Sequence, residues 1–161
     1  DLLYLMEQYP DICIVTDTKF VNEEEVTRQF RAMLNDAYET SLTYLFGRMI
    51  IQVYTPLMFS VADNLYHFPH YIFTLYNSSF DGTEDSFRQQ ATFCQENGIM
   101  GITMSDYYWS GNAPDYYSIA SRRGIRIYVH TVNDADRVNS LLAAGVSGVY
   151  TDTLLPSDVV Q

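Results

Sequence analysis

Apolar and polar residues alternate with two different periods along this chain. The clearest stretch is residues 124–152, GIRIYVHTVNDADRVNSLLAAGVSGVYTD. Over 125–130 every second residue is apolar, which predicts a β-strand. Apolar residues recur at helical spacing over 135–144, and a second short apolar run follows over 146–151. A strand, a helix and a strand in this order predict parallel strands joined by a right-handed crossover.

The predicted helix of this stretch carries matching signals at both ends. Asn133 or Asp134 supplies a side chain of the kind that caps a helix N-terminus. Gly145 follows the last apolar position and can end a helix in the left-handed conformation. The stretch is therefore a complete strand–helix–strand unit.

The rest of the chain repeats this pattern. Strands are predicted at 12–18, 48–54, 71–75, 99–104, 125–131 and 147–151. Helices are predicted near 22–38, 56–65, 84–97 and 115–123, with a loop, DYYWSGNAP, over 106–114. Strands that alternate with helices are typical of a parallel sheet.

The length of the chain favours part of a barrel. A TIM (β/α)₈ barrel typically needs about 250 residues. The 161 residues therefore correspond to about six strand–helix units of an incomplete barrel, forming one domain over 1–161. An open doubly wound sheet is the alternative, although no Gly-rich phosphate loop follows the first strand.

The net charge, the length of the apolar runs and the cysteine spacing limit which partners and which sites the chain can have. The formal net charge of −11 argues against nucleic acid and is compatible with a cation site. No apolar run approaches the roughly 18 residues that a membrane helix needs. Cys13, in a predicted buried strand, and Cys94, in a predicted helix, show no CxxC or metal-site spacing, so we expect two unbridged, buried thiols.

Polar residues stand at the carboxyl ends of the predicted strands, where parallel α/β folds carry their working residues. Asp17 and Lys19 are two residues apart, so their side chains share one face of the strand. They predict either a metal-binding carboxylate beside an anion-binding ammonium group or a simple ion pair. The other strand ends carry Gln52, Tyr54, Asn77, Asp106, His130 and Asp152.

The three histidines give weaker signals. His130 shares a strand face with Tyr128, and a lone histidine is more often a hydrogen-bonded wall residue than an acid or base. His67 and His70 flank a Phe-Pro pair. Because proline breaks a helix, the two histidines are not held at a fixed spacing for binding a metal, and we interpret both as loop residues. Asp106 opens a loop that either lines a substrate cleft or packs its aromatic residues on a rim.

Three segments resemble glycerophosphodiester phosphodiesterases. IVTDTK at 14–19 resembles the strand that carries a metal-binding acidic residue with a lysine two places on. IIQVYTPLMF at 50–59 resembles the next strand and its helix. The stretch 124–152 resembles the family's closing signature, an aromatic residue with Thr-Val-Asn, then a helix, Gly-Val-x-Gly and Thr-Asp. Asp17 stands where Glu is usual, and His130 where Trp is usual.

The resemblance implies hydrolysis of a glycerophosphodiester to glycerol 3-phosphate and an alcohol, with a divalent cation, Ca²⁺ or Mg²⁺. It implies that Asp17 is a metal ligand and that Lys19 is catalytic, because its ammonium group would neutralise phosphate charge. The substrate pocket would be shaped by Gln52, Tyr54, Tyr128 and His130.

The family's opening motifs are absent from these residues: no His-Arg pair occurs, and no Glu-x-Asp strand followed by a histidine. By the resemblance, the first barrel strands, the other metal carboxylates and the catalytic histidines would precede Asp1. We therefore expect this chain alone to be inactive, and expect its strand edges to favour self-association or association with the missing part. A non-catalytic binding or assembly module is the alternative function.

Overall fold

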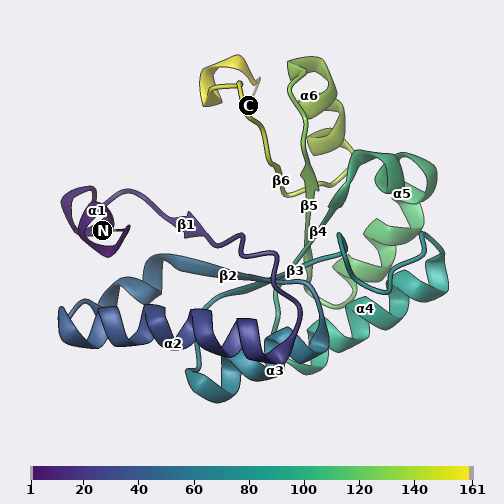
Figure 1. Ribbon diagram of the computed structural model, residues 1–161. Coiled ribbons are helices and arrows are strands. Elements are labelled where there is room, and N and C mark those ends of the chain that lie inside the picture. The colour runs from purple at the N-terminus through teal and green to yellow at the C-terminus, as the bar shows by residue number, and fades with distance from the viewer. Residues whose placement is uncertain (1, 160–161) are drawn as a thin grey trace. The chain divides into compact units, whose positions relative to one another are not determined.

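The computed structural model describes residues 2–159, except for the side chains of 112–114. The chain forms two compact units that divide after Ile72 (Figure 1). Every strand pair assigned within these units is parallel, as the alternation of strands and helices predicts. No helix in the described part is both long and apolar enough to cross a membrane.

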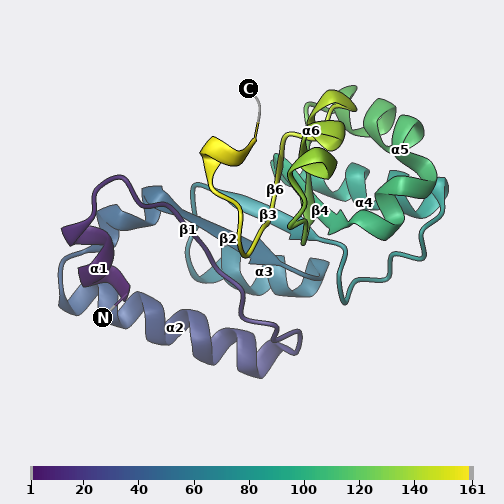
Figure 2. The ribbon, with the colours of Figure 1, turned by 90° about the horizontal axis from the view of Figure 1, so that it is seen from above.

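The first unit is built on two paired strands. Ile14 of β1 pairs with Met49 of β2, and Val15 pairs with Ile50. Helices α2 and α3 lie beside each other on the same side of these strands (Figures 1 and 2). The elements are α1 (Leu2–Gln8), β1 (Ile14–Val15), α2 (Glu23–Glu39), the 3-10 helix η1 (Thr43–Arg48), β2 (Met49–Val53) and α3 (Pro56–Leu65).

Helix α2 begins and packs as its sequence predicts. The Asn22 side chain accepts a hydrogen bond of 2.9 Å from the backbone N–H of Glu25, and three glutamates occupy the positive first turn. Its buried residues recur at helical spacing, so one stripe faces the core. They are Val26, Phe30, Leu34 and Ala37.

The core of the first unit is rich in aromatic rings. Phe68 lies between helices and strands, with its ring centroid 5.7 Å from that of Phe30 and 5.3 Å from that of Phe46. Tyr66 adds a third ring at 4.9 Å. Such tilted and edge-on pairs each add roughly 0.5–1.5 kcal/mol beyond the area they bury.

Arg48 fastens the segment after α1 to the start of β2. Its guanidinium donates hydrogen bonds to the carbonyl oxygens of Tyr9 at 3.0 Å, Pro10 at 2.7 Å and Ile12 at 3.2 Å, and also to that of Met6. Carbonyl groups at the end of a helix lack partners within the helix, so one side chain satisfies the end of α1.

The second unit contains a run of parallel strands in chain order. β4 pairs with β3 and with β5, and β5 also pairs with β6. Helices α4 and α5 lie side by side next to β4 (Figure 2). The elements are β3 (Tyr71–Thr74), whose first two residues belong to the first unit, α4 (Glu84–Glu96), β4 (Gly101–Ser105), α5 (Asp106–Ser121), β5 (Arg126–His130), α6 (Ala135–Ala143), β6 (Gly148–Val149) and the 3-10 helix η2 (Pro156–Asp158).

The prediction of a loop over 106–114 is wrong, because α5 begins at Asp106 and continues to Ser121. The glycine and proline of this segment suggested a loop, but burial outweighs local propensity here. Trp109 is 2% exposed, and Tyr116, seven residues further on, is fully buried. These two large side chains lie on one face of the helix and hold it against the core.

Helix ends in the second unit follow the predicted glycine signals. Gly145 has a φ of +97° just after α6, as the left-handed helix end requires. A Cβ atom at this position would overlap the ring of Tyr117, so a side chain has no room. Asp134, one of the two predicted capping residues, caps the start of α6 by accepting from the Arg137 backbone N–H at 2.7 Å.

Candidate functional site

Asp17 lies just after β1, and its carboxylate meets side chains from the end of β2. The Tyr54 hydroxyl donates to Asp17 Oδ1, and the Gln52 side-chain amide donates to the same oxygen at 3.3 Å. Gln52 also donates to the Tyr54 hydroxyl oxygen at 3.0 Å. Lys19 Nζ lies 3.6 Å from Asp17 Oδ2. The predicted neighbourhood of Asp17, Lys19 and Gln52 is therefore found.

The strand register explains why these residues meet. Pairing continues beyond β1, because the Thr16 backbone N–H donates to the Ile50 carbonyl at 3.0 Å. The Thr16 hydroxyl then accepts from the Gln52 backbone N–H at 3.1 Å. Side chains alternate along a strand, so Gln52 and Tyr54 share one face and reach Asp17 together.

Burial and charge divide this group into an inner and an outer part. Burial, and then the hydrogen bond to Asp17, raises the pKa of Tyr54 well above its usual range, so its hydroxyl stays a donor at neutral pH. The Lys19 and Asp17 side chains are 64% and 51% exposed, so their ion pair is weak. Asp17 is thus held from inside by neutral donors and is open to a ligand from outside.

Cys13 is exposed, so its predicted burial is wrong. Cys13 lies one residue before β1, and Val15, which is paired within β1, is also 38% exposed, so this face of the strand is uncovered among the described residues. Cys94 is buried in α4 as expected, and burial raises the pKa of its thiol to about 12. Both cysteines are free thiols.

The Asp17 carboxylate is a suitable ligand for a divalent cation, but no further metal-ligating side chains lie beside it in the described part of the chain. Ca²⁺ and Mg²⁺ take about six or more oxygen ligands, several of them from the protein. Among residues 2–159, no group of three or more His, Cys, Asp or Glu side chains could hold a metal ion. The described residues therefore offer one carboxylate ligand and do not form a complete cation site by themselves.

Tyr128 and His130 form a second group of predicted residues, on β5. Both are half-buried on one face of the strand, and the alternate residues Ile127 and Val129 are buried on the other face. The His130 ring packs edge-on against Tyr150 at 6.2 Å, and the His130–Thr131 peptide bond is cis. This packing agrees with the wall-residue interpretation of His130.

Asp106 lies at the end of β4 and forms an ion pair that sequence reasoning missed. Arg137 Nε donates to Asp106 Oδ2 at 2.9 Å, and Arg137 Nη2 donates to Asp106 Oδ1 and, at 2.7 Å, to the Ser110 hydroxyl. The Arg137 guanidinium lowers the pKa of Asp106. No local sequence pattern marks this pair, because Arg137 lies 31 residues after Asp106 and in another helix.

Asn133 explains the closing signature of the sequence. Its side-chain oxygen accepts from the Thr151 hydroxyl at 2.9 Å and from the Asp152 backbone N–H at 2.8 Å. Its amide nitrogen donates to an Asp152 carboxylate oxygen at 3.3 Å. The Thr-Val-Asn and Thr-Asp segments are thus joined side by side, which makes Asp152 part of a structural lock.

The remaining candidates do not join either group. Asn77 is exposed in a turn with a φ of +60°. His67 lies in the loop after α3, as predicted, where its Nδ1 lies 3.0 Å from an Asp63 carboxylate oxygen. His70 directly precedes β3, and its carbonyl oxygen accepts from the Ile51 backbone N–H at 2.9 Å.

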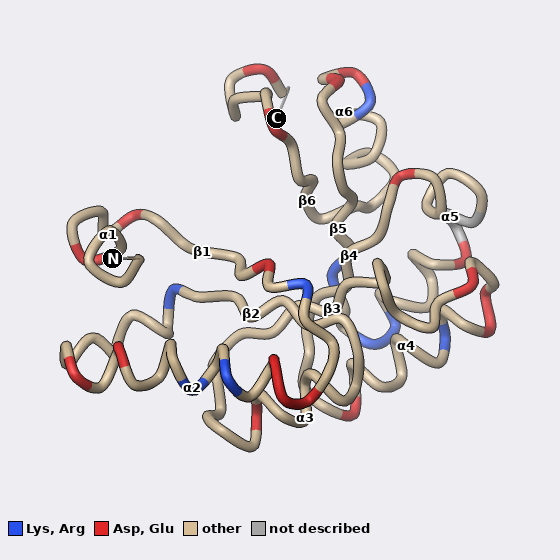
Figure 3. The backbone as a smooth tube through the Cα atoms, viewed as in Figure 1, with Lys and Arg blue, Asp and Glu red and all other residues tan. Residues whose placement is uncertain are grey.

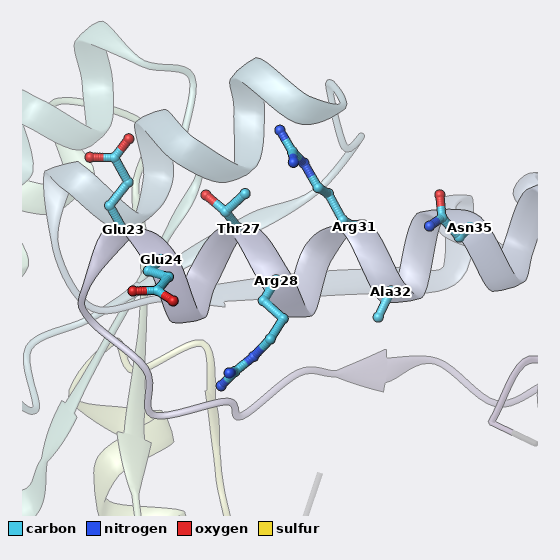
Figure 4. A pocket seen from close by; sticks show the side chains of 7 residues that line it. All are labelled: Glu23, Glu24, Thr27, Arg28, Arg31, Ala32 and Asn35. Atoms are coloured by element: carbon cyan, nitrogen blue, oxygen red, sulfur yellow. The ribbon is translucent and has the colours of Figure 1, made fainter.

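A hollow along α2 is a poor candidate for the site. Its lining comes from one helix, and Figure 4 shows Arg28 and Arg31 extending in different directions from it. Side chains that diverge cannot grip one ligand. Figure 3 shows acidic residues distributed over both units rather than gathered at one element. The strand ends therefore remain the candidate site.

Parallel strands joined by helices, with polar groups at the carboxyl ends of the strands, define an α/β protein of the barrel class. The model of the glycerophosphoryl diester phosphodiesterase family matches residues 12–155, and this chain belongs to that family. The resemblance seen in the sequence motifs is thereby confirmed. A comparison with curated proteins found no significant match.

Solved structures show the same fold. One is a glycerophosphodiester phosphodiesterase from Parabacteroides distasonis, with 15% identity and a TM-score of 0.66 over 93% of this chain. Another is a proposed glycerophosphoryl diester phosphodiesterase from Silicibacter pomeroyi, with 16% identity and a TM-score of 0.66 over 93% of this chain. This chain spans 57% and 50% of their lengths, so the predicted incomplete barrel is confirmed.

Proposed function

We propose that this chain is the C-terminal portion of a barrel that hydrolyses glycerophosphodiesters to glycerol 3-phosphate and an alcohol. Family membership supports the class of reaction. The observation that carries the proposal to particular residues is the group of Asp17, Lys19, Gln52 and Tyr54 at the ends of β1 and β2. That end of a parallel α/β fold is where active sites lie.

Asp17 acts in this proposal as one oxygen ligand of a divalent cation, Ca²⁺ or Mg²⁺, on which members of the family generally depend. Its Oδ1 accepts from Tyr54 and Gln52, so these two residues fix the orientation of the carboxylate. Outer partners of this kind tune a metal ligand. The other ligands come from segments outside the described residues.

Lys19 neutralises phosphate charge in this proposal. Its ammonium group is exposed and lies 3.6 Å from Asp17 Oδ2, so a phosphate held by a cation at Asp17 would lie within reach of this positive charge. Electrostatic stabilisation of the charge that develops in a transition state is a major source of catalysis. Tyr128 and His130, half-buried on one face of β5, would line the part of the pocket that holds the glycerol or the alcohol.

The test is release of glycerol 3-phosphate from a glycerophosphodiester, with Ca²⁺ or Mg²⁺ and then with a chelator. The chain should be inactive alone and become active when the segment that completes the barrel is added. General acid–base groups contribute roughly 10²–10⁴-fold, so their absence should be obvious.

Two outcomes would contradict this proposal. Turnover by the chain alone that disappears in His130→Ala would place the acid–base chemistry within these residues. No turnover with the completing segment present, despite a folded complex, would favour the alternative of a non-catalytic binding or assembly module.

A further inference from the structure

Lys19 has a backbone conformation that its residue type disfavours. Its φ is +57°, in the left-handed region where the Cβ atom of an L-residue crowds the following carbonyl oxygen. Lys19 lies in the segment 16–21, which belongs to no helix, strand or turn, so no regular element accounts for this value. Such backbone outliers persist where surrounding contacts hold them, and they are concentrated at functional sites.

Two other described residues that are not glycine have a positive φ, and both have ordinary explanations. Ser41, with a φ of +60°, directly follows the C-cap of α2, where the Leu42 backbone N–H donates to the Ala37 carbonyl at 2.9 Å, as in a common left-handed helix end. Asn77, also at +60°, lies in a turn, and asparagine occupies this region more readily than most residues. Lys19 therefore needs an explanation of its own.

The Tyr54 hydroxyl supplies one, because it has three hydrogen-bond partners. It donates to Asp17 Oδ1, and its oxygen accepts from the Gln52 side-chain amide at 3.0 Å and from the backbone N–H of Lys19. A hydroxyl group has one hydrogen and two acceptor lone pairs. The two incoming donors occupy both lone pairs, so the single hydrogen is left to point at Asp17.

The left-handed turn lets one residue serve this group twice. The torsion φ is the rotation about the N–Cα bond, so it sets the direction of the side chain relative to the N–H of the same residue. At +57° the Lys19 N–H meets the Tyr54 hydroxyl while its ammonium nitrogen lies 3.6 Å from Asp17 Oδ2. The backbone and the side chain of Lys19 thus act on the same carboxylate from two sides.

The backbone contact is the firmer of the two. The Lys19 side chain is 64% exposed, so its ion pair with Asp17 contributes little to holding the turn. Tyr54 is only 1% exposed, and a hydrogen bond to a buried group is stronger than one in water. The bond from the Lys19 N–H to Tyr54 is therefore what offsets the cost of the left-handed conformation.

We infer that Lys19 is a positioning residue through its backbone: its left-handed conformation delivers the N–H that directs the Tyr54 hydroxyl toward Asp17. The purpose of this arrangement, an oriented carboxylate for a cation, rests on the proposed function. The arrangement itself is measurable in this chain without any hydrolysis.

The first test is amide hydrogen exchange of Lys19, measured by NMR on the chain. The amide should exchange more slowly than in an unstructured chain, and Tyr54→Phe should speed its exchange about 3-fold to 10-fold, because the acceptor is lost. Tyr71→Phe removes another buried hydroxyl from the same unit and should leave the Lys19 amide unchanged. An unprotected Lys19 amide, or equal effects of the two variants, would overturn the inference.

The second test changes the backbone preference at position 19. Lys19→Gly and Lys19→Val both remove the ammonium group, but glycine accepts a positive φ and a β-branched residue does not. Protection of the amide at position 19 should persist in Lys19→Gly and fall at least about 3-fold in Lys19→Val.

Ser41→Val is the matched control, because it places the same branched side chain at a left-handed position away from Tyr54. It should leave the amide of Lys19 as protected as in the unmodified chain. Equal protection in Lys19→Gly and Lys19→Val, or a loss in Ser41→Val as large as in Lys19→Val, would overturn the inference.

Measurements on the completed barrel separate this inference from the proposed function. Both variants at position 19 should lose turnover alike, but only Lys19→Val should also weaken cation binding, by about 3-fold to 10-fold. Unchanged cation affinity in Lys19→Val would contradict the positioning role. A protected Lys19 amide in a completed barrel without turnover would refute the proposed function alone, and an unprotected amide in an active barrel would refute the positioning role alone.

Discussion

Asp17 and Asp106 occupy equivalent places in the two units, yet their surroundings differ. Each lies just after a strand and beside a basic side chain. Asp106 accepts two hydrogen bonds from one guanidinium, with Ser110 completing the contact. Asp17 accepts from the neutral donors Tyr54 and Gln52, with Lys19 at 3.6 Å. The Asp106 carboxylate is therefore saturated by partners from its own chain, whereas the Asp17 carboxylate keeps an open side.

We propose that this difference separates a structural carboxylate, Asp106, from a functional one, Asp17. A bidentate pair with arginine fixes geometry and leaves little for a ligand. A carboxylate held by a buried hydroxyl and an amide is oriented but not neutralised, which is how proteins prepare a ligand for a cation. Position at a strand end is therefore a weaker guide to function than the nature of the partners.

The largest expected effect comes from Asp17→Asn in the completed barrel. We expect turnover to fall by at least about 100-fold, since loss of a ligand should exceed the roughly 10–100-fold loss caused by outer partners. Asp106→Asn is the matched control and should lower turnover far less. Initial rates of glycerol 3-phosphate release compare the two, and equal losses would remove the distinction between the carboxylates.

Tyr54→Phe should have the next largest effect on activity. Loss of its hydroxyl frees Asp17 to rotate, so turnover should fall on the order of 10-fold to 100-fold. Tyr71 is a matched control in the same unit, because its hydroxyl donates to Asp63 at 3.2 Å and burial likewise raises its pKa. Tyr71→Phe should cost about 1 kcal/mol of unfolding free energy and leave turnover unchanged. Similar rates in the two variants would show that Tyr54 is structural.

Lys19→Met should lower turnover about 10-fold, because an exposed ammonium group stabilises phosphate charge less than a buried donor does. The affinity for Ca²⁺ or Mg²⁺ should change little, since the substitution leaves Asp17 and its two neutral donors in place. Rates measured at several cation concentrations separate these effects. A change in cation affinity without a change in maximal rate would refute the assigned role.

The smallest effect concerns the Asp106–Arg137 pair and depends on pH. The pKa of Asp106 is lower in the folded protein, so its stabilisation is present above the ordinary pKa of 3.8 and is lost as pH falls through the folded value. Asp106→Asn should therefore cost about 1 kcal/mol at pH 7, at the upper end for a partly exposed pair.

Urea unfolding of both proteins measures this difference. The gap in unfolding free energy should stay constant between about pH 6 and pH 8, and should close as the solution is acidified below about pH 4. A gap that widens in acid would contradict the ion-pair explanation.

Much of the fold could be predicted because periodicity and end signals agree. The strand–helix order, the Asn22 cap and the Gly145 helix end all follow from local chemistry. The start of α5 could not be predicted, since the burial of Trp109 depends on tertiary packing. The exposure of Cys13 was missed for a related reason, because the local pattern cannot show that the face of β1 shared by Cys13 and Val15 is left uncovered.

The site was partly predictable. The sequence predicted that Asp17 and Lys19 lie near Gln52, and the structure brings these three side chains together. The contact between Tyr54 and Asp17 was not predicted, and Lys19 lies beyond the end of β1 with a φ of +57°, so strand alternation does not account for its position. Arg137 was missed because it comes from a helix far along the chain, and no local pattern marks its partner. Their roles in binding metal and substrate remain predictions.

The most direct test of the central claim is the affinity of the completed barrel for Ca²⁺ and Mg²⁺, measured by calorimetry without substrate. The unmodified protein and Asp106→Asn should bind the cation with the same dissociation constant, and Asp17→Asn should bind at least about 10-fold more weakly. An unchanged affinity in Asp17→Asn, or a loss confined to Asp106→Asn, would contradict the assignment of Asp17 as the metal-binding carboxylate.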